Sequence, residues 1–357
     1  MRRRILIYGA TGYTGRLIAE HARNWCHSLV VAGRTAERVQ MLATTLGVTG
    51  RAVSLADMVA LDETLGDVSV LINAAGPFAQ TSRRLIESCL RTRTHYLDIT
   101  GELPIFQNAF CYDDVARKRG IMIMPGVGLG IVASDCLARY VATLLPNAKY
   151  LRIGILRPSA FSRGTFRSAL GMANSRVSIR RNGRLTSVPV GRLQRAFDYG
   201  DGERESVAVS WADVFTAYYS TGILNIEAYL ETDVASRILY QVSGGIVDAI
   251  RFAPIQRWIN LALSAWPEGP SAQQRCAEKC VIVAEAEDSW RRLRLARLET
   301  QDGYSFTAEA ASAIAMRAMR GDFLPGFQTP AQVYGADFVL GFNATRREEL
   351  RLPYPDR

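Results

Sequence analysis

Histidine is scarce in this chain of 357 residues, and long apolar runs are absent. The three histidines, His21, His27 and His95, are too few to suggest a structural zinc site or a Ser-His-Asp triad, so we predict no metal. The six cysteines include no CxxC pair and follow no signal-type apolar stretch, which predicts free thiols in a reducing, cytoplasmic compartment. No uninterrupted apolar run reaches the roughly 20 residues of a transmembrane helix.

Lysine is almost missing, yet the chain is basic. Lysine and arginine together number 43, only three of them lysines, against 34 acidic residues, which gives a net charge of +9. Such a charge favours acidic partners, such as a phosphorylated cofactor, anionic lipid or an acidic carrier protein. No nucleic-acid-binding module is recognisable, so we predict no nucleic-acid partner.

Short apolar runs and segments of helical periodicity alternate through the first third of the chain. This alternation predicts an α/β fold whose N-terminal part is a Rossmann-type, doubly wound parallel sheet. The expected strands are Ile5–Tyr8, Ser28–Ala32, Arg51–Leu55, Val68–Asn73, Thr94–Asp98 and Ile121–Met124.

A glycine-rich turn follows the first expected strand and opens the first expected helix. Gly9 permits a tight turn, Gly12 lets the backbone approach a pyrophosphate, and Gly15 lets helix and strand pack closely. The helix N-terminus then offers N–H groups and a positive dipole to the phosphates. The cofactor-binding residues predicted here are Gly9, Thr11, Gly12, Tyr13, Thr14 and Gly15.

Arginine stands where an NAD site usually has an acidic residue. Arg34 follows the second expected strand, and Arg38 lies one helical turn later. A guanidinium suits a ribose 2′-phosphate, so we predict NADP as the cofactor. The alternative is that both are ordinary surface arginines.

Small residues after the other strands complete the predicted cofactor site. Those after the fourth strand leave room for a ribose, while Pro77 and Phe78 can form a wall beside the nicotinamide. The alternative is an ordinary strand-to-helix turn. The residues assigned to this part of the site are Ser54, Asn73, Ala74, Ala75, Gly76, Pro77, Phe78 and Gly101.

Three residues near the fifth strand are candidates for catalysis. Tyr96 and Asp98 share one face of that strand, and Glu102 follows in the loop at the carboxyl edge, where ligands bind. Reduction by a nicotinamide needs a proton donor, and Tyr96 is the first candidate. Alternatively, Tyr96 and Asp98 only shape the nicotinamide pocket.

Together these motifs resemble the saccharopine dehydrogenase-like oxidoreductases, and in particular the trans-acting enoyl reductases. The resemblance implies an N-terminal NADP-binding domain, a second mixed α/β domain, and reduction of either an imine or a carbon–carbon double bond of a lipid or polyketide. The segments that carry it are Gly9–Gly15, Ala74–Phe78, Tyr96–Glu102, Gly164-Thr165, Trp211–Asp213, Pro325–Pro330 and Tyr334–Phe338.

One stretch departs from the family pattern. Gly130 and Ala133 stand where relatives commonly carry an acid and a proline, whereas Asp135 remains. The departure implies a different, less polar substrate.

The second domain is expected to be a largely antiparallel sheet flanked by helices. Asn182-Gly183 between two strand-like runs predicts a hairpin, and Phe306–Met319 a long helix. We place the domains at residues 1–135, 136–328 and 329–357, the last packing back on the first. Further candidates for a site in the cleft between domains are Asp135, Thr165, Asp213 and Tyr218.

The apolar segment Ser236–Leu263, interspersed with arginines, is interpreted either as core helices or as a lipid-facing surface at a membrane periphery.

The motifs and the resemblance leave three candidate functions. The first is an NADPH-dependent reductase of a C=C bond in a hydrophobic substrate, free or carrier-bound. The second is an imine reductase, and the third is an NADP-binding partner protein without turnover. The sequence does not indicate an oligomeric state.

Overall fold

A computed structural model describes residues 4–156, 162–164, 176–232 and 268–350. The chain divides into two compact units, each built from two separate stretches. Unit 1 comprises Met1–Val132 and Gly303–Gly335, and unit 2 comprises Ala133–Asp302 and Ala336–Arg357. In the described ranges, no helix has the length and apolar character needed to cross a bilayer.

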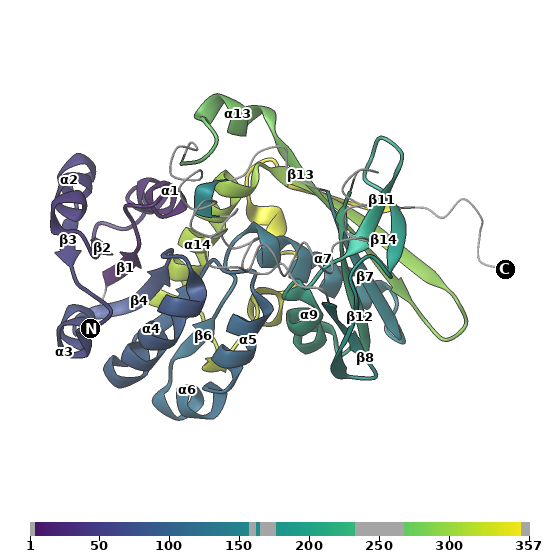
Figure 1. The fold of residues 1–357 in the computed structure, drawn as a ribbon, viewed down its shortest axis with the longest axis horizontal. Coiled ribbons are helices and arrows are strands. Elements are labelled where there is room, and N and C mark those ends of the chain that lie inside the picture. The colour runs from purple at the N-terminus through teal and green to yellow at the C-terminus, as the bar shows by residue number, and fades with distance from the viewer. Residues whose placement is uncertain (1–3, 157–161, 165–175, 233–267, 351–357) are drawn as a thin grey trace, which may run out of the picture. The chain divides into compact units, whose positions relative to one another are not determined.

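Unit 1 is built on a seven-stranded sheet in which every neighbouring pair runs parallel (Figure 1). Its order is β15-β6-β5-β4-β1-β2-β3. Apart from β3, the strands are almost wholly buried, which is why most of them appear in the sequence as short apolar runs. Their bounds are β1 Arg4–Tyr8, β2 Leu29–Gly33, β3 Thr49–Ala52, β4 Val68–Asn73, β5 His95–Asp98, β6 Met122–Met124 and β15 Gly326–Phe327.

Helices cover both faces of this sheet, as expected of a doubly wound fold. Helices α1 and α14 pack together and against β1 and β4 on one face, while α3, α4, α5 and α6 lie on the other, where α4 contacts each of the other three (Figure 1). The bounds are α1 Tyr13–Ala22, α2 Ala36–Leu46, α3 Met58–Leu65, α4 Phe78–Thr92, α5 Leu103–Phe110, α6 Asp113–Arg119, α14 Gly303–Met319 and α15 Pro330–Tyr334. The predicted Rossmann-type sheet is thus confirmed.

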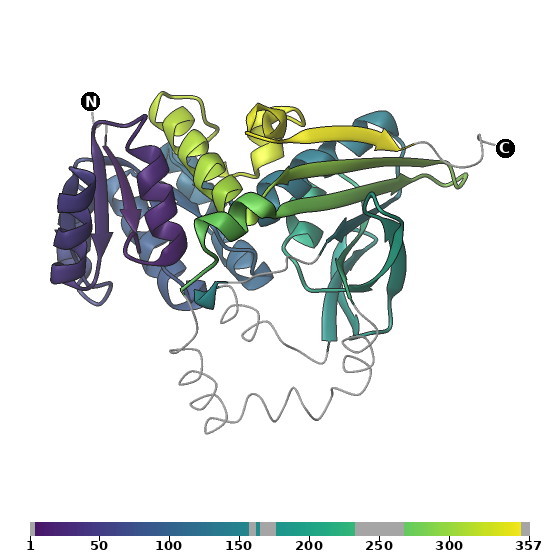
Figure 2. The same ribbon diagram turned by 90° about the horizontal axis from the view of Figure 1, so that it is seen from above.

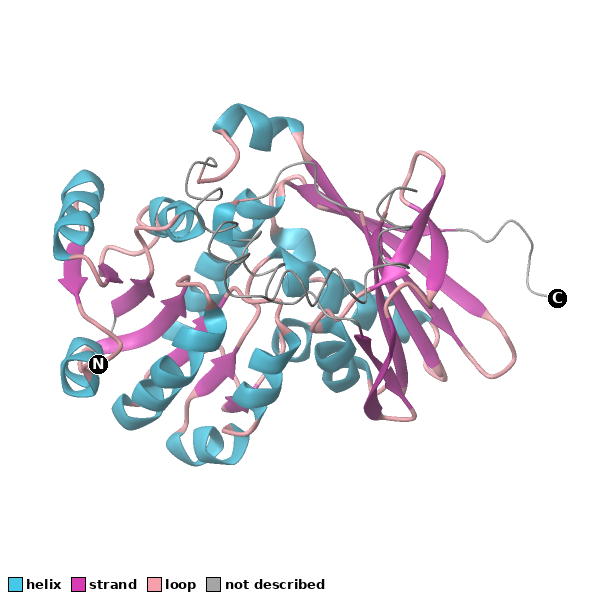
Figure 3. Cartoon of the chain, in the orientation of Figure 1, coloured by secondary structure: helices cyan, strands magenta, loops and turns pink. Residues whose placement is uncertain are grey.

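Unit 2 contains a nine-stranded sheet that is antiparallel except where β12 pairs with β7 (Figures 2 and 3). This confirms the second, largely antiparallel sheet. Its strands are β7 Tyr150–Ile155, β8 Arg176–Arg181, β9 Arg184–Pro189, β10 Gln194–Asp198, β11 Glu203–Ala208, β12 Asn225–Glu231, β13 Lys279–Glu287, β14 Leu293–Gln301 and β16 Arg346–Leu350. Its helical elements are α9 Asp213–Thr221, α13 Ala272–Ala277 and the 3-10 helix Phe338–Gly341, while α7 Leu129–Leu144 starts in unit 1 and continues into unit 2.

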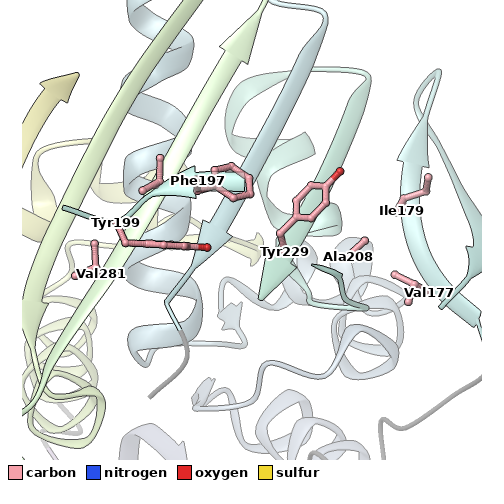
Figure 4. Packing of buried hydrophobic residues seen from close by; sticks show 8 residues of the cluster. Val177, Ile179, Phe197, Tyr199, Ala208, Tyr229 and Val281 are labelled. Carbon is pink, nitrogen blue, oxygen red and sulfur yellow. The ribbon is translucent and has the colours of Figure 1, made fainter. Parts of the chain in front are cut away.

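The predicted hairpin forms between β8 and β9. Asn182 and Gly183 both have positive φ, 47° and 77°, as a tight hairpin turn requires. Figure 4 shows part of the unit 2 core, in which the rings of Phe197 and Tyr229 lie 5.5 Å apart. A Cβ on Gly154 would come within 2.8 Å of the Phe197 ring, so that ring lies directly on β7.

The C-terminal part of the chain divides differently from the expected boundaries. Residues 303–335, which include α14 and β15, belong to unit 1, whereas 336–350 belong to unit 2. The reason is strand pairing: β15 extends the parallel sheet beside β6, and β16 pairs with β14. The first boundary falls after Val132 instead of residue 135. The segment Ser236–Leu263 and Thr165 lie outside the described residues.

Candidate functional site

The glycine turn after β1 is shaped by two glycines that the chain's own packing requires. Gly9 has φ +82°, and a Cβ there would lie 2.8 Å from the Cβ of Ala75. A Cβ on Gly15 would lie 2.3 Å from the Gly9 carbonyl oxygen, so α1 can approach the turn only with glycine at this position. Both positions therefore serve the close contact of strand, turn and helix.

Gly12 differs from its two neighbours in the motif. A Cβ there would meet only the Gly9 carbonyl oxygen, at 3.4 Å, and the residue is exposed. Gly12 is also the N-cap of α1, whose first-turn N–H groups have no partner within the helix. The open space and these N–H groups fit a bound pyrophosphate, for which a side chain at Gly12 would be in the way.

The two predicted phosphate-binding arginines lie at the carboxyl end of β2. Arg34 and Arg38 are exposed, and neither forms an ion pair with any carboxylate among the described residues. Thr11 of the glycine turn is close by, since a Cβ on Gly33 would lie 3.8 Å from its Oγ1. Burial raises the pKa of Tyr8, and the positive charge of Arg34 partly offsets that rise, so Arg34 lies near the end of β1 as well. This corner combines unneutralised positive charge with the glycine turn, as an NADP site needs.

The segment after β4 is held by the side chain of Asn73. Its Nδ2 donates to the hydroxyls of Thr81 (3.1 Å) and Tyr96 (3.3 Å), and its Oδ1 accepts from the N–H of Ala75 (3.0 Å). The Gly76-Pro77 peptide that follows is cis, and Phe78, buried, begins α4. Asn73 therefore braces the predicted ribose-binding turn from within, while Gly76 and Pro77 are exposed.

Tyr96 and Asp98 form a fully buried pair. The Tyr96 hydroxyl donates to Asp98 Oδ2 at 2.8 Å, and Asp98 Oδ1 accepts from the N–H groups of Thr100 and Gly126, both at 3.0 Å. Burial raises the pKa of Asp98 to about 6, and these hydrogen bonds limit the rise. Burial also raises the pKa of Tyr96 well above its ordinary value of 10. The pair ties the ends of β5 and β6 together, and this geometry favours a positioning role over direct proton donation.

The remaining predicted residues are partly or fully exposed. Glu102 is half-buried, and its negative charge contributes to the raised pKa of Asp98, so its carboxylate lies near that buried group. Gly101 precedes it at the same edge. Ser54 is exposed beyond β3, which ends at Ala52 because it pairs with β2 over Thr49–Ala52 and not over the expected Arg51–Leu55.

Sequence reasoning missed Tyr304, at the start of α14. Its ring lies edge-on to that of Tyr13, with the centroids 5.2 Å apart. Thr307, one turn later, accepts a hydrogen bond from the N–H of Leu129 (3.1 Å). The N-terminal part of α14 thus contacts both Tyr13, next to the glycine turn, and the loop after β6. No local motif could have revealed this contact, because the two tyrosines are far apart in sequence.

Two of the candidates in unit 2 are buried acids. Asp135 accepts a hydrogen bond from the Ser220 hydroxyl at 2.6 Å. Asp213 is fully buried, and among the described residues neither of its carboxyl oxygens has a hydrogen-bond partner of normal geometry. Ser134 lies close enough to lower its pKa. Burial raises that pKa to about 7. Tyr218 instead packs against the Arg180 guanidinium, 4.1 Å from the ring centroid.

Comparison with known proteins adds to this geometry. Residues 5–124 match the family of the saccharopine dehydrogenase NADP binding domain. The chain is 30% identical, over 139 residues, to the trans-acting enoyl reductase of Mycobacterium leprae. It is 31% identical, over 142 residues, to that of Mycobacterium tuberculosis. Each match covers 37% of this chain and 33% of the relative. The alignments thus span about a third of the length of these relatives.

Solved structures resemble the whole chain in fold. Saccharopine dehydrogenase (L-Glu forming) from Saccharomyces cerevisiae aligns with a TM-score of 0.62 at 15% identity, covering 98% of this chain and 100% of that one. The homospermidine synthase of Legionella pneumophila, solved in complex with NAD, aligns with a TM-score of 0.63 at 8% identity, covering 100% and 95%. At such identities the likeness concerns the fold alone.

Proposed function

Because residues 5–124 match the saccharopine dehydrogenase NADP binding domain, we propose that this chain is an NADPH-dependent reductase of a carbon–carbon double bond in a hydrophobic acyl substrate. The observation that supports this most is the 30–31% identity to trans-acting enoyl reductases, over 37% of the chain. The net charge of +9 favours a substrate carried by an acidic protein.

The residues of unit 1 account for binding and orientation in this proposal. NADPH supplies the hydride. The α1 N-terminus at Gly12 holds the pyrophosphate, and Arg34 binds the 2′-phosphate. Asn73, Tyr96 and Asp98 fix the carboxyl ends of β4, β5 and β6, where the nicotinamide half of NADPH would be held.

Reduction also requires a proton at the second carbon of the double bond. Among Tyr96, Asp98 and Glu102, only Glu102 is partly exposed. We therefore assign proton delivery to Glu102 and positioning to the buried pair. Glu102→Gln should lower turnover at least tenfold while leaving the Kd for NADPH within about twofold, because the carboxylate acts on the substrate.

The test is NADPH oxidation at 340 nm with trans-2-enoyl thioesters of increasing chain length, beside mixtures of a 2-oxo acid and an amine that form an imine. Oxidation with the thioesters, lost in Gly12→Val, is the expected result. Oxidation only with the imine mixtures would replace the proposal by imine reduction. NADPH binding without oxidation by either set would point to a partner protein without turnover.

A further inference from the structure

Two residues of the segment Pro325–Pro330, Gly326 and Phe327, are explained by their packing contacts. Gly326 has φ +97°, and a Cβ there would lie 2.4 Å from Asp113 Oδ1. The N–H of Phe327 donates to the same carboxylate oxygen at 2.7 Å, and its ring lies edge-on to that of Phe110. These contacts fix β15 against α5 and α6.

The next two residues have no such explanation. Gln328 is 4% exposed and Thr329 is fully buried. The Gln328 amide nitrogen donates to the Pro325 carbonyl (3.0 Å), which fixes the amide, yet its Oε1 has no hydrogen-bond partner among the described residues. Thr329 occupies the N-cap position of α15 without making the usual side-chain cap, and its Oγ1 also lacks a partner within the described part of the chain. One unsatisfied acceptor and one unsatisfied hydroxyl therefore lie on consecutive residues.

Buried polar atoms without partners are uncommon, because their loss of contact with water is not compensated. A structural water is the ordinary way to satisfy them. A bound ligand could satisfy them instead. The position of Gln328 and Thr329 in the sheet helps to decide between a water and a ligand.

The pair lies at the ligand-binding edge of the parallel sheet. The N–H of Gln328 donates to the carbonyl of Ile123, so the segment continues β15 beyond its carboxyl end beside β6. With neighbouring strands about 4.8 Å apart, the pair is roughly 10 Å from the end of β5 and roughly 19 Å from the glycine turn. It also lies on the side of that turn away from β2 and Arg34. A dinucleotide with its 2′-phosphate at Arg34 would extend its nicotinamide end toward this pair.

We propose that Gln328 and Thr329 form a binding site for an amide group. The Thr329 hydroxyl donates to the amide carbonyl, and Gln328 Oε1 accepts from the amide N–H. Two sources have this chemistry: the carboxamide of the nicotinamide ring, and an amide in the carrier arm of an acyl thioester substrate. The second source rests on the proposed function, whereas the first needs only NADP binding.

The experiment compares ligands with and without the amide in Gln328→Leu and Thr329→Val. Calorimetry first measures NADP⁺ beside 2′-phospho-ADP-ribose, which lacks nicotinamide. With NADP⁺ saturating, it then measures S-crotonyl-N-acetylcysteamine beside S-ethyl thiocrotonate, which lacks the amide. Thr94→Val is the matched control, because Thr94 is fully buried at the opposite end of β5. Thr329→Ser retains the hydroxyl and should restore binding.

Loss of one hydrogen bond should raise the Kd of the ligand that contains the amide about three- to tenfold and leave the Kd of the matching ligand without the amide unchanged. A selective loss for NADP⁺ assigns the site to the carboxamide, and a selective loss for the cysteamine thioester assigns it to the substrate. Equal binding of all four ligands by the variants and the wild type would overturn the proposal and leave a structural water as the partner. Failure of the wild type to bind NADP⁺ at all would refute the proposed function instead.

Discussion

The buried carboxyl of Asp213 makes the stability of unit 2 depend on pH in a predictable direction. Its pKa rises from 3.8 to about 7 because the group is removed from water. A folded-state pKa above the unfolded value means that the folded state holds the proton more tightly. The contribution of Asp213 to stability should therefore be most favourable below pH 4, become less favourable as the pH rises from about 4 to 7, and stay level above 7.

The size of this effect follows from the shift. About three pKa units at 1.36 kcal/mol each correspond to roughly 4 kcal/mol in the free energy of unfolding. Asp213→Asn removes the ionisation and keeps the shape. We expect the variant to be more stable than the wild type by up to about 4 kcal/mol at pH 8, with the difference shrinking steadily toward pH 4.

Urea unfolding of both proteins from pH 4 to 8, followed by circular dichroism, measures this difference. Only the difference between the two curves is diagnostic, because His95 titrates with the opposite sign: burial lowers its pKa to about 4. Asp201→Asn, at an exposed site of unit 2, serves as control and should shift stability by about 0.5 kcal/mol at most. A difference that does not change with pH, or an Asp213→Asn variant less stable than the wild type at pH 8, would refute the reasoning.

Three further predictions concern the cofactor site. Arg34→Ala should weaken NADPH binding about ten- to a hundredfold and hardly affect NADH, as calorimetry can show, and equal losses would contradict a contact with the 2′-phosphate. Gly12→Val should abolish NADPH binding with an unchanged melting temperature, whereas Gly15→Val should unfold the domain, because its Cβ meets the Gly9 carbonyl at 2.3 Å. Tyr304→Ala should weaken NADPH about three- to tenfold through the loss of its contact with Tyr13, while Tyr304→Phe should not.

The buried strands of unit 1 were predictable because each forms a local run of apolar residues in the sequence. The strand Val68–Asn73 is a continuous apolar run, and the structure has β4 over the same residues. Edge strands carry no such pattern. Half-exposed β3 lies at Thr49–Ala52, two residues before its predicted start. Charged β16 was not predicted at all, since it pairs with β14 through contacts such as Arg297 with Glu348.

The candidate site shows the same division. The two-residue period of a strand predicted that Tyr96 and Asp98 share a face, and their side chains are indeed hydrogen-bonded. Their complete burial was not predictable, because Asn73 and Gly126 reach them from other strands. The contact between Tyr13 and Tyr304 depends on the chain returning to unit 1 at α14, after residues 133–302 of unit 2, which no local pattern specifies.

Each unit is formed by two stretches of chain that are far apart in sequence, and this affects folding during translation. Helix α14 and strand β15, which complete unit 1, follow an insertion of 170 residues, and β16, which extends the sheet of unit 2, comes later still. At a synthesis rate of about 5–20 residues per second, the first six strands would wait roughly 10–30 s on the ribosome with the face under α14 uncovered. The emerging chain should therefore bind chaperones during translation, and ribosome-bound chains arrested before residue 303 should be more protease-sensitive in their first 132 residues than chains arrested after residue 350.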